Sequence, residues 1–211
     1  CSDRQMETAI DFCKTYHCQL AIHAMGTKAI DRAVSRAAAE EKWNSGPEPY
    51  VRVEHITLPS QESIDLAVQK GIGFVTQPIF MYAEIESYMK NLGKARMKQC
   101  YPVRHMLDCG VNLCFSTDAP ATSWAVPSDP FSNIKAAVTR RAYDGTDCGG
   151  SQVVDVETAV ILYTKAAAKM VGFEKIGQIK EGYKADFLVL DKDMMEIPAG
   201  EIDRVHVAET Y

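Results

Sequence analysis

The sequence predicts an α/β fold with a parallel sheet over residues 1–172, followed by a short β-rich domain over residues 173–211. Three observations predict this organisation. Short apolar segments alternate with longer segments whose apolar residues recur at helical spacing, as in βαβ units. The short segments are almost continuously apolar, which is typical of parallel strands covered on both faces. From Phe173 onward, short β segments and turns replace this alternation.

The expected elements follow in order along the chain. Apolar or alternating runs predict strands at 19–23, 51–58, 71–77 and 111–117. Helical spacing predicts helices at 3–12, 28–41, 60–70, 82–91, 102–108, 131–142 and 155–171. Two long loops are expected, at 119–130 with three prolines and at 144–150 with several Gly and Asp residues. Short β segments are expected at 176–179, 185–190 and 205–208.

Terminating residues support several of these boundaries. Ser60 is a good N-cap, and Glu62 in the first turn suits the positive end of a helix. Pro78 ends the third strand. Pro102 at the start of the next helix and Gly110 after its end follow the usual asymmetry of helix termini.

Composition and charge exclude several classes of protein. The chain is 46% hydrophobic and 24% charged, with a net charge of −5, which is ordinary for a globular protein. No apolar run approaches the roughly 18 residues of a membrane span, and no basic stripe suggests nucleic acid. We therefore expect neither a membrane nor a nucleic-acid partner. The chain opens at Cys1 in front of a helix, so we expect a piece of a longer protein whose targeting signal is not observable.

The seven cysteines favour a reducing, cytoplasmic setting, because an odd number does not suit a disulfide framework. Cys13/Cys18 and Cys109/Cys114 each have four residues between them, a spacing that also occurs in zinc sites. A four-thiolate structural zinc site is thus an alternative. The second Cys of each pair lies in a strand segment, which favours a small buried hydrophobe instead.

Polar residues close four of the predicted strands, namely His23, His55, Gln77 and Asp118. In parallel α/β barrels the chemistry lies at the carboxyl ends of the strands, where side chains from several strands converge. His and Asp ligate catalytic divalent metals, and a carboxylate beside such a metal can take a proton from water. A single strand-end His is often structural, and Asp before Ala-Pro is often a turn residue. Three such residues on different strands nevertheless favour a metal site.

Six segments carry a resemblance to a known family. The chain resembles the C-terminal half of the metal-dependent amidohydrolase superfamily, and its nearest branch is the YtcJ-like, or amidohydrolase family 3, proteins. The segments are LAIHAMGTKAID, VRVEHITLP, FVTQP, YPVRHMLDCGVNLCFSTDAP, the TRR at 139–141 and IGQIKEGYKADFLVLDKD.

The resemblance implies strands five to eight of a distorted (β/α)8 barrel, plus part of a small β-sandwich. It implies that His23, His55 and Asp118 ligate a divalent metal, usually zinc, with one or two ions in the whole protein. Asp118 would also be the general base that later protonates the leaving group. The reaction implied is hydrolysis of non-peptide C–N bonds in small amides, cyclic amides or N-acyl amino acids.

Substrate contacts are expected from three residues at this face of the barrel: Gln77 at the end of the seventh strand, Arg104 after the Tyr-Pro pair, and Trp124 in the 119–130 loop. The alternative for Arg104 is a surface or capping role, and the alternative for Trp124 is packing of the loop. Arg140 and Arg141 are expected to be surface charges on a helix; the alternative is that one of them reaches the site.

The sequence departs from the family pattern at two points. Thr27 stands where the branch usually has Asp, and no counterpart is found for the first-strand His-x-His pair or the fourth-strand Lys or Glu. We therefore expect the 211-residue piece alone to be inactive and to self-associate through exposed strand edges. The alternative is a non-catalytic regulatory or structural protein on the same fold.

Overall fold

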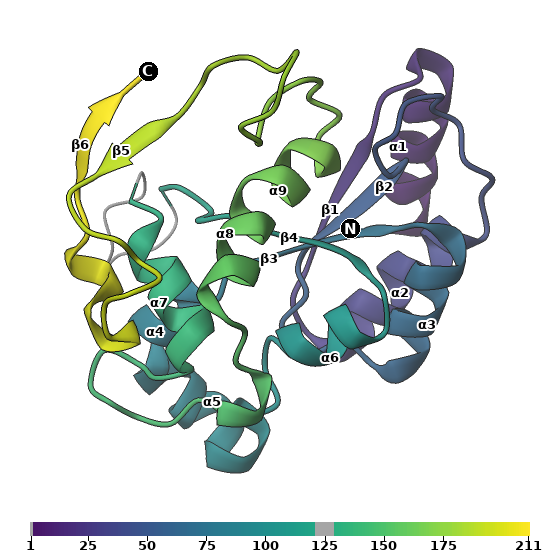
Figure 1. Ribbon diagram of the computed structural model, residues 1–211. Helices are drawn as coiled ribbons and strands as arrows, with labels where there is room; N and C mark the ends of the chain where they lie inside the picture. Colours follow the sequence, from purple (N-terminus) through teal and green to yellow (C-terminus); the bar gives the residue numbers. More distant parts are fainter. Residues whose placement is uncertain (1, 121–128) are drawn as a thin grey trace.

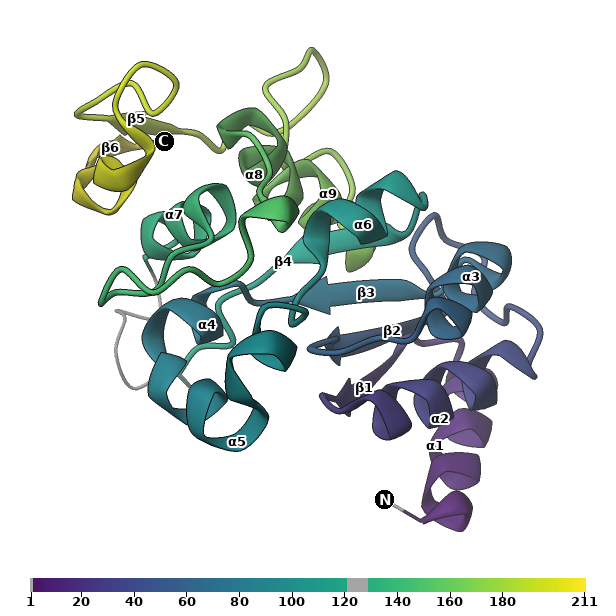
Figure 2. The ribbon, with the colours of Figure 1, turned by 90° about the horizontal axis from the view of Figure 1, so that it is seen from below.

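A computed structural model describes residues 2–120 and 129–211 of the chain. Its main sheet has four parallel strands in the order β1 (Leu20–Ala24), β2 (Val51–His55), β3 (Gly73–Thr76) and β4 (Asn112–Phe115). Figure 2 shows these strands side by side with their carboxyl ends on one side of the molecule. Sequential parallel strands joined by helices confirm the predicted α/β class and are the arrangement of a partial (β/α) barrel.

Helices connect and cover these strands (Figure 1). They are α1 (Asp3–Tyr16), α2 (Thr27–Ala38), α3 (Gln61–Lys70), α4 (Ile79–Ala83), α5 (Ile85–Met97), α6 (Val103–Asp108), α7 (Phe131–Thr139), α8 (Val156–Tyr163) and α9 (Lys165–Met170). The Ser60 cap forms as predicted, since its hydroxyl accepts a hydrogen bond from the Ser63 amide. Gly71, expected to open the third strand, instead ends α3 with a φ of 67°, and β3 begins at Gly73.

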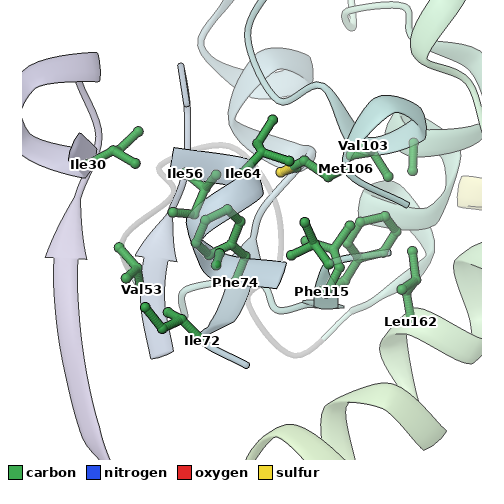
Figure 3. Packing of buried hydrophobic residues seen from close by; sticks show 14 of the residues in the cluster. Ile30, Val53, Ile56, Ile64, Ile72, Phe74, Val103, Met106, Phe115 and Leu162 are labelled. Carbon is green, nitrogen blue, oxygen red and sulfur yellow. The ribbon is translucent and has the colours of Figure 1, made fainter. Parts of the chain in front are cut away.

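The main core lies between the sheet and the helices that follow its strands. Val53, Phe74 and Phe115 are buried, and they belong to one cluster with Ile30 of α2 and Ile64 of α3 (Figure 3). Because alternate residues of a strand point to opposite faces, the side chains of the intervening residues are directed to the other face of the sheet. That other face forms the candidate site.

Two predicted helices are broken in the structure. The helix expected at 82–91 is replaced by α4 and α5, which meet at Glu84 (φ −124°, ψ 29°). The helix expected at 155–171 is interrupted at Thr164 (φ −117°, ψ −84°). The second break lets Met170 of α9 pack against Val75 and Cys114, a tertiary contact that helical periodicity does not encode.

Arg140 corrects the expectation of a surface charge. It ends α7 with a φ of 50°, and only 2% of it is exposed. Its guanidinium donates hydrogen bonds to the carbonyls of Cys100, Tyr101, Cys148 and Gly149, at 2.7–3.3 Å. Burial lowers the pKa of Arg140. Arg141, by contrast, is exposed as predicted.

The C-terminal region contains an antiparallel pair, β5 (Leu188–Leu190) and β6 (Val207–Thr210), and the 3-10 segment η2 (Ala199–Arg204) that packs near α7. The strand expected at 176–179 does not form, and Ile179 is 91% exposed because no described strand pairs with this segment. The domain boundary near Phe173 stays a prediction.

No helix within 2–120 or 129–211 is long and apolar enough to cross a membrane. The six cysteines that the structure describes are free thiols.

Candidate metal and substrate site

A cavity of about 790 Å³ lies on the inward face of the sheet, opposite the main core. Its walls come from alternate strand residues, which is the pattern expected of barrel interiors. The strand residues that line it are Ala21 and His23 of β1, Arg52, Glu54 and His55 of β2, Val75 of β3, Gln77 after β3, and Cys114, Phe115 and Ser116 at β4. Helix α9 and the segment around Phe173 form another wall.

The structure brings the two predicted histidine ligands together. The ring centroids of His23 and His55 are 4.5 Å apart, with an angle of 73° between the ring planes. Regular alternation along β2 would place His55 on the same face of the sheet as Val51 and Val53, the face that packs in the main core. Ala24, the β1 residue in register with His55, is also buried in that core. The left-handed backbone of His55 (φ 74°) and Ile56 (φ 51°) breaks the alternation, and His55 lines the cavity instead.

Asp118 also lines this cavity and also has a left-handed backbone, with a φ of 55°. A positive φ is costly for a residue other than Gly and persists only where surrounding structure enforces it, often at functional sites. Two of the three predicted ligands therefore have strained backbones at the ends of their strands.

Gln77 determines which nitrogen of His55 carries the proton. Its side-chain amide donates to the Ser116 hydroxyl (2.7 Å), which directs the amide oxygen Oε1 to Nδ1 of His55 at 3.0 Å. Because Oε1 is only an acceptor, Nδ1 must be the donor, and Nε2 keeps its lone pair. An imidazole oriented in this way is typical of metal ligands. Gln77, expected to contact substrate, lines the cavity, and its amide oxygen and nitrogen each make a hydrogen bond within the protein.

Of the other two residues expected to contact substrate, one belongs to the described structure, and it does not line the cavity. Arg104 lies on α6 and is not among the lining residues; its Nε donates to the carbonyl of Val153 (3.2 Å). Trp124 lies outside the described residues. Thr27, at the position of the family's Asp, donates its hydroxyl to the carbonyl of Leu58 (2.9 Å) and so ties the loops after β1 and β2 together.

Sequence reasoning missed a charged network inside the cavity. Arg52 and Glu54 form an ion pair at 2.7 Å, and Arg52 also donates to the side-chain oxygen of Gln19 (3.0 Å). Glu54 is in register with His23 on the neighbouring strand. The alternation in VRVEH could have indicated these residues, because it places Arg52 and Glu54 on the same face of β2.

Cys114 lines the same cavity and is buried. Burial raises the pKa of its thiol to about 12, and the Glu54 carboxylate adds to the shift. It is therefore a neutral thiol at physiological pH, not a thiolate ligand or nucleophile.

The donor set fits part of a divalent-metal site. Two imidazoles face each other, one with its Nε2 lone pair free, and a carboxylate lines the same cavity. Within the described ranges, no three His, Cys, Asp or Glu side chains are close enough to hold an ion, so these residues do not make a closed site. The same finding contradicts the four-thiolate alternative: Cys109 contacts His105 and Gln61 on α6 and α3, while Cys114 lies in the cavity.

Comparisons with known proteins agree with this geometry. The profile of the amidohydrolase family matches residues 1–211. YtcJ of Bacillus subtilis is 29% identical over 196 residues, which are 91% of this chain and 36% of YtcJ. The N-substituted formamide deformylase of Arthrobacter pascens is 30% identical, over 91% of this chain and 35% of that protein.

A solved structure extends the comparison to the fold. An uncharacterized metal-dependent hydrolase from Pyrococcus furiosus superposes with a TM-score of 0.71 and 27% identity, over 89% of this chain and 36% of that one. The chain thus spans little more than a third of each of these proteins. On the match along its whole length, this chain belongs to the amidohydrolase family.

Proposed function

We propose that the protein containing this chain hydrolyses C–N bonds of small amide-type molecules, with a divalent metal held by His23, His55 and Asp118. The observation that carries the proposal is the contact between the His23 and His55 rings in a cavity that Asp118 also lines. The name of the Arthrobacter pascens relative, a deformylase of N-substituted formamides, supports the C–N bond class. The name of the Pyrococcus furiosus protein, a metal-dependent hydrolase, supports the metal.

Zinc is the ion that we propose, because imidazole nitrogen and carboxylate oxygen are its usual ligands in hydrolytic sites that keep a position open. Such a metal supplies Lewis acidity, which polarises a carbonyl and acidifies water. Nε2 of His55 and the imidazole of His23 are the nitrogen donors of the proposed site. Arg52 pairs with Glu54 at the edge of this site, so its charge is already compensated.

The chain's own groups account for substrate orientation and proton movement. The carboxylate of Asp118 takes a proton from the attacking water while the water oxygen bonds to the carbonyl carbon. Asp118 then delivers that proton to the departing nitrogen as the C–N bond breaks, so the carboxylate is regenerated. Gln77 acts as a positioning residue, since it holds the Nδ1–H of His55 and keeps Nε2 directed to the site.

The test is hydrolysis of N-formyl and N-acyl amines by the full-length protein loaded with zinc. His55→Ala and Asp118→Asn should each lower kcat/KM at least 100-fold with a retained fold. The matched control is His105→Ala, because His105 is exposed and bonds to Gln61 outside the cavity. Equal activity of His55→Ala and the wild type would refute the proposal and favour a non-catalytic protein on the same fold.

We also propose that residues 1–211 alone do not turn over substrate, because the described ligands do not form a group of three. The sheet order leaves β1 with β2 as its one described neighbour, so the other edge of β1 can pair with a second copy. Turnover by the zinc-supplemented 211-residue piece would contradict the first statement. A monomer in sedimentation velocity at about 100 μM would contradict self-association, which at that concentration requires a Kd below about 1 mM.

A further inference from the structure

A second cavity, of about 260 Å³, lies beyond the carboxyl ends of β1 and β2, the strands that carry the two histidines. The segments after both histidine strands form part of its wall: Met25 follows His23 by two residues, and Thr57 follows His55 by two. Two extended residues span at most about 7 Å. The backbones of Met25 and Thr57, which line the second cavity, thus lie within about 7 Å of the backbones of His23 and His55.

The shape of this cavity is held by contacts between the two loops. The Leu58 amide donates to the carbonyl of Met25 (3.3 Å), and the Thr27 hydroxyl donates to the carbonyl of Leu58 (2.9 Å). The Tyr101 amide donates to the carbonyl of Thr57 (2.7 Å). The carbonyls of Met25, Leu58 and Thr57 each accept a hydrogen bond within the protein, so the polar side chains of the wall are the stronger candidates for ligand recognition.

The opposite wall comes from the junction of α4 and α5 and is rich in acceptors. Glu84 lies at this junction and is partly buried, but its side chain makes no cap hydrogen bond to α5. No ion pair joins the Glu84 carboxylate to another described residue. Burial raises the pKa of Glu84. About two turns further, Asn91 donates to Ser87, which leaves the Asn91 amide oxygen as an acceptor.

The remaining lining is mostly apolar and carries no described Lys or Arg. Met25, Leu58 and Leu92 line the cavity with Tyr88. The Tyr88 hydroxyl lies 2.6 Å from the Tyr101 hydroxyl, so the ring is what Tyr88 contributes to a ligand. A small cavity with one uncompensated carboxylate, an amide oxygen and an aromatic ring suits an ammonium group on an apolar stem.

We propose that this second cavity is the specificity pocket of the site, and that it takes a primary ammonium group on a short alkyl arm of the substrate, with Glu84 as the counter-charge. The inference rests on the proposed hydrolysis of small amides. It deepens that proposal by naming the substrate class as amides whose nitrogen or acyl substituent ends in an amine.

The test compares two substrates of the full-length, zinc-loaded protein that differ only at the end of the arm. N-formyl-1,4-diaminobutane ends in an ammonium group, and N-formyl-n-pentylamine ends in a methyl group. The wild type should prefer the first by at least about tenfold in kcat/KM, which corresponds to about 1.4 kcal/mol. Glu84→Gln should abolish the preference, and Glu84→Lys should reverse it.

Glu86→Gln is the matched control. Glu86 lies two residues further along the same helix, is exposed, and bonds to Tyr143 rather than lining the cavity. This variant should keep the preference, which separates a direct contact from a general effect of negative charge. An unchanged preference in Glu84→Gln, or an equal loss in Glu86→Gln, would overturn the inference.

A binding measurement separates failure of the pocket from failure of the proposed hydrolysis. Calorimetric titration of the metal-free protein with the same two formamides needs no turnover. If neither formamide is hydrolysed by the zinc-loaded protein, the proposed function fails for formamides, and titration alone decides the pocket. Tighter binding of N-formyl-1,4-diaminobutane by at least about tenfold, lost in Glu84→Gln, supports it. Equal binding of the two formamides, or no binding of either, overturns it.

Discussion

Gln77→Leu tests how a neutral side chain prepares His55 for metal binding. Leu keeps the approximate volume of Gln but removes the oxygen that accepts the Nδ1–H of His55 and the nitrogen that donates to Ser116. Gln77 is 1% exposed and His55 is 6% exposed, so water cannot readily replace the lost partner. The substitution therefore affects both stability and the tautomer of the imidazole.

The magnitudes follow from these contacts. A buried donor left without an acceptor costs about 1–3 kcal/mol, so the free energy of unfolding should fall by about 2 kcal/mol. Without the Gln77 oxygen, the proton of His55 is free to occupy Nε2, the nitrogen proposed to bind the metal. Loss of such a supporting hydrogen bond typically lowers metal affinity by about 10–100-fold. Gln77→Glu keeps an acceptor at this position and should restore affinity to within about threefold of the wild type, well inside that loss.

Zinc affinity of the full-length protein is measured by competition with a chromophoric chelator, and stability by urea unfolding of the metal-free protein. Gln61→Leu is the control, because Gln61 makes the same kind of bond to a histidine, His105 (2.6 Å), on the exposed surface. Its zinc affinity should equal that of the wild type. Wild-type affinity in Gln77→Leu, or an equal loss in Gln61→Leu, would refute the role assigned to Gln77.

Three further predictions concern the chain outside the two histidines. Arg140→Met removes the donors to four buried carbonyls and should lower the free energy of unfolding by about 3–5 kcal/mol in urea titration, whereas Arg141→Met should change it by less than about 0.5 kcal/mol. Iodoacetamide at pH 8 should leave Cys114 unmodified in peptide mass spectra, because its pKa of about 12 lies far above that pH; the half-buried Cys109 should react. As pH rises, protection of Cys114 should persist until the protein unfolds. Ser60→Ala removes an N-cap and a hydrogen bond to Asp31, and should cost about 1–2 kcal/mol by thermal unfolding.

Much of the architecture could be predicted because it depends on local patterns. The four strands, the Ser60 cap and the turn at Gly110 follow from periodicity and from residues that favour helix ends. The predicted helix at 155–171 failed for a physical reason: every residue in it tolerates a helix, and the break at Thr164 is required only by the packing of Met170 on the sheet.

In the candidate site, too, local patterns predict some features and miss others. Alternation along β1 predicts that His23 faces the cavity, but alternation along β2 puts His55 on the wrong face. The positive φ of His55 depends on the surrounding fold, and it alone brings the two rings together. Arg104 was placed near substrate by its position in a motif, yet its partner is Val153, 49 residues away.

The sequence by itself determined the α/β class, the family and the set of strand-end residues from which a site can be built, because these depend on residue types at fixed spacings. Only the tertiary structure decided how those residues act. It joined His55 to Gln77, buried Arg140 among backbone carbonyls and left Glu84 without a counter-charge in a second cavity. Each of these outcomes depends on groups distant in the chain, and the energy of a buried polar group is set by its partners in space.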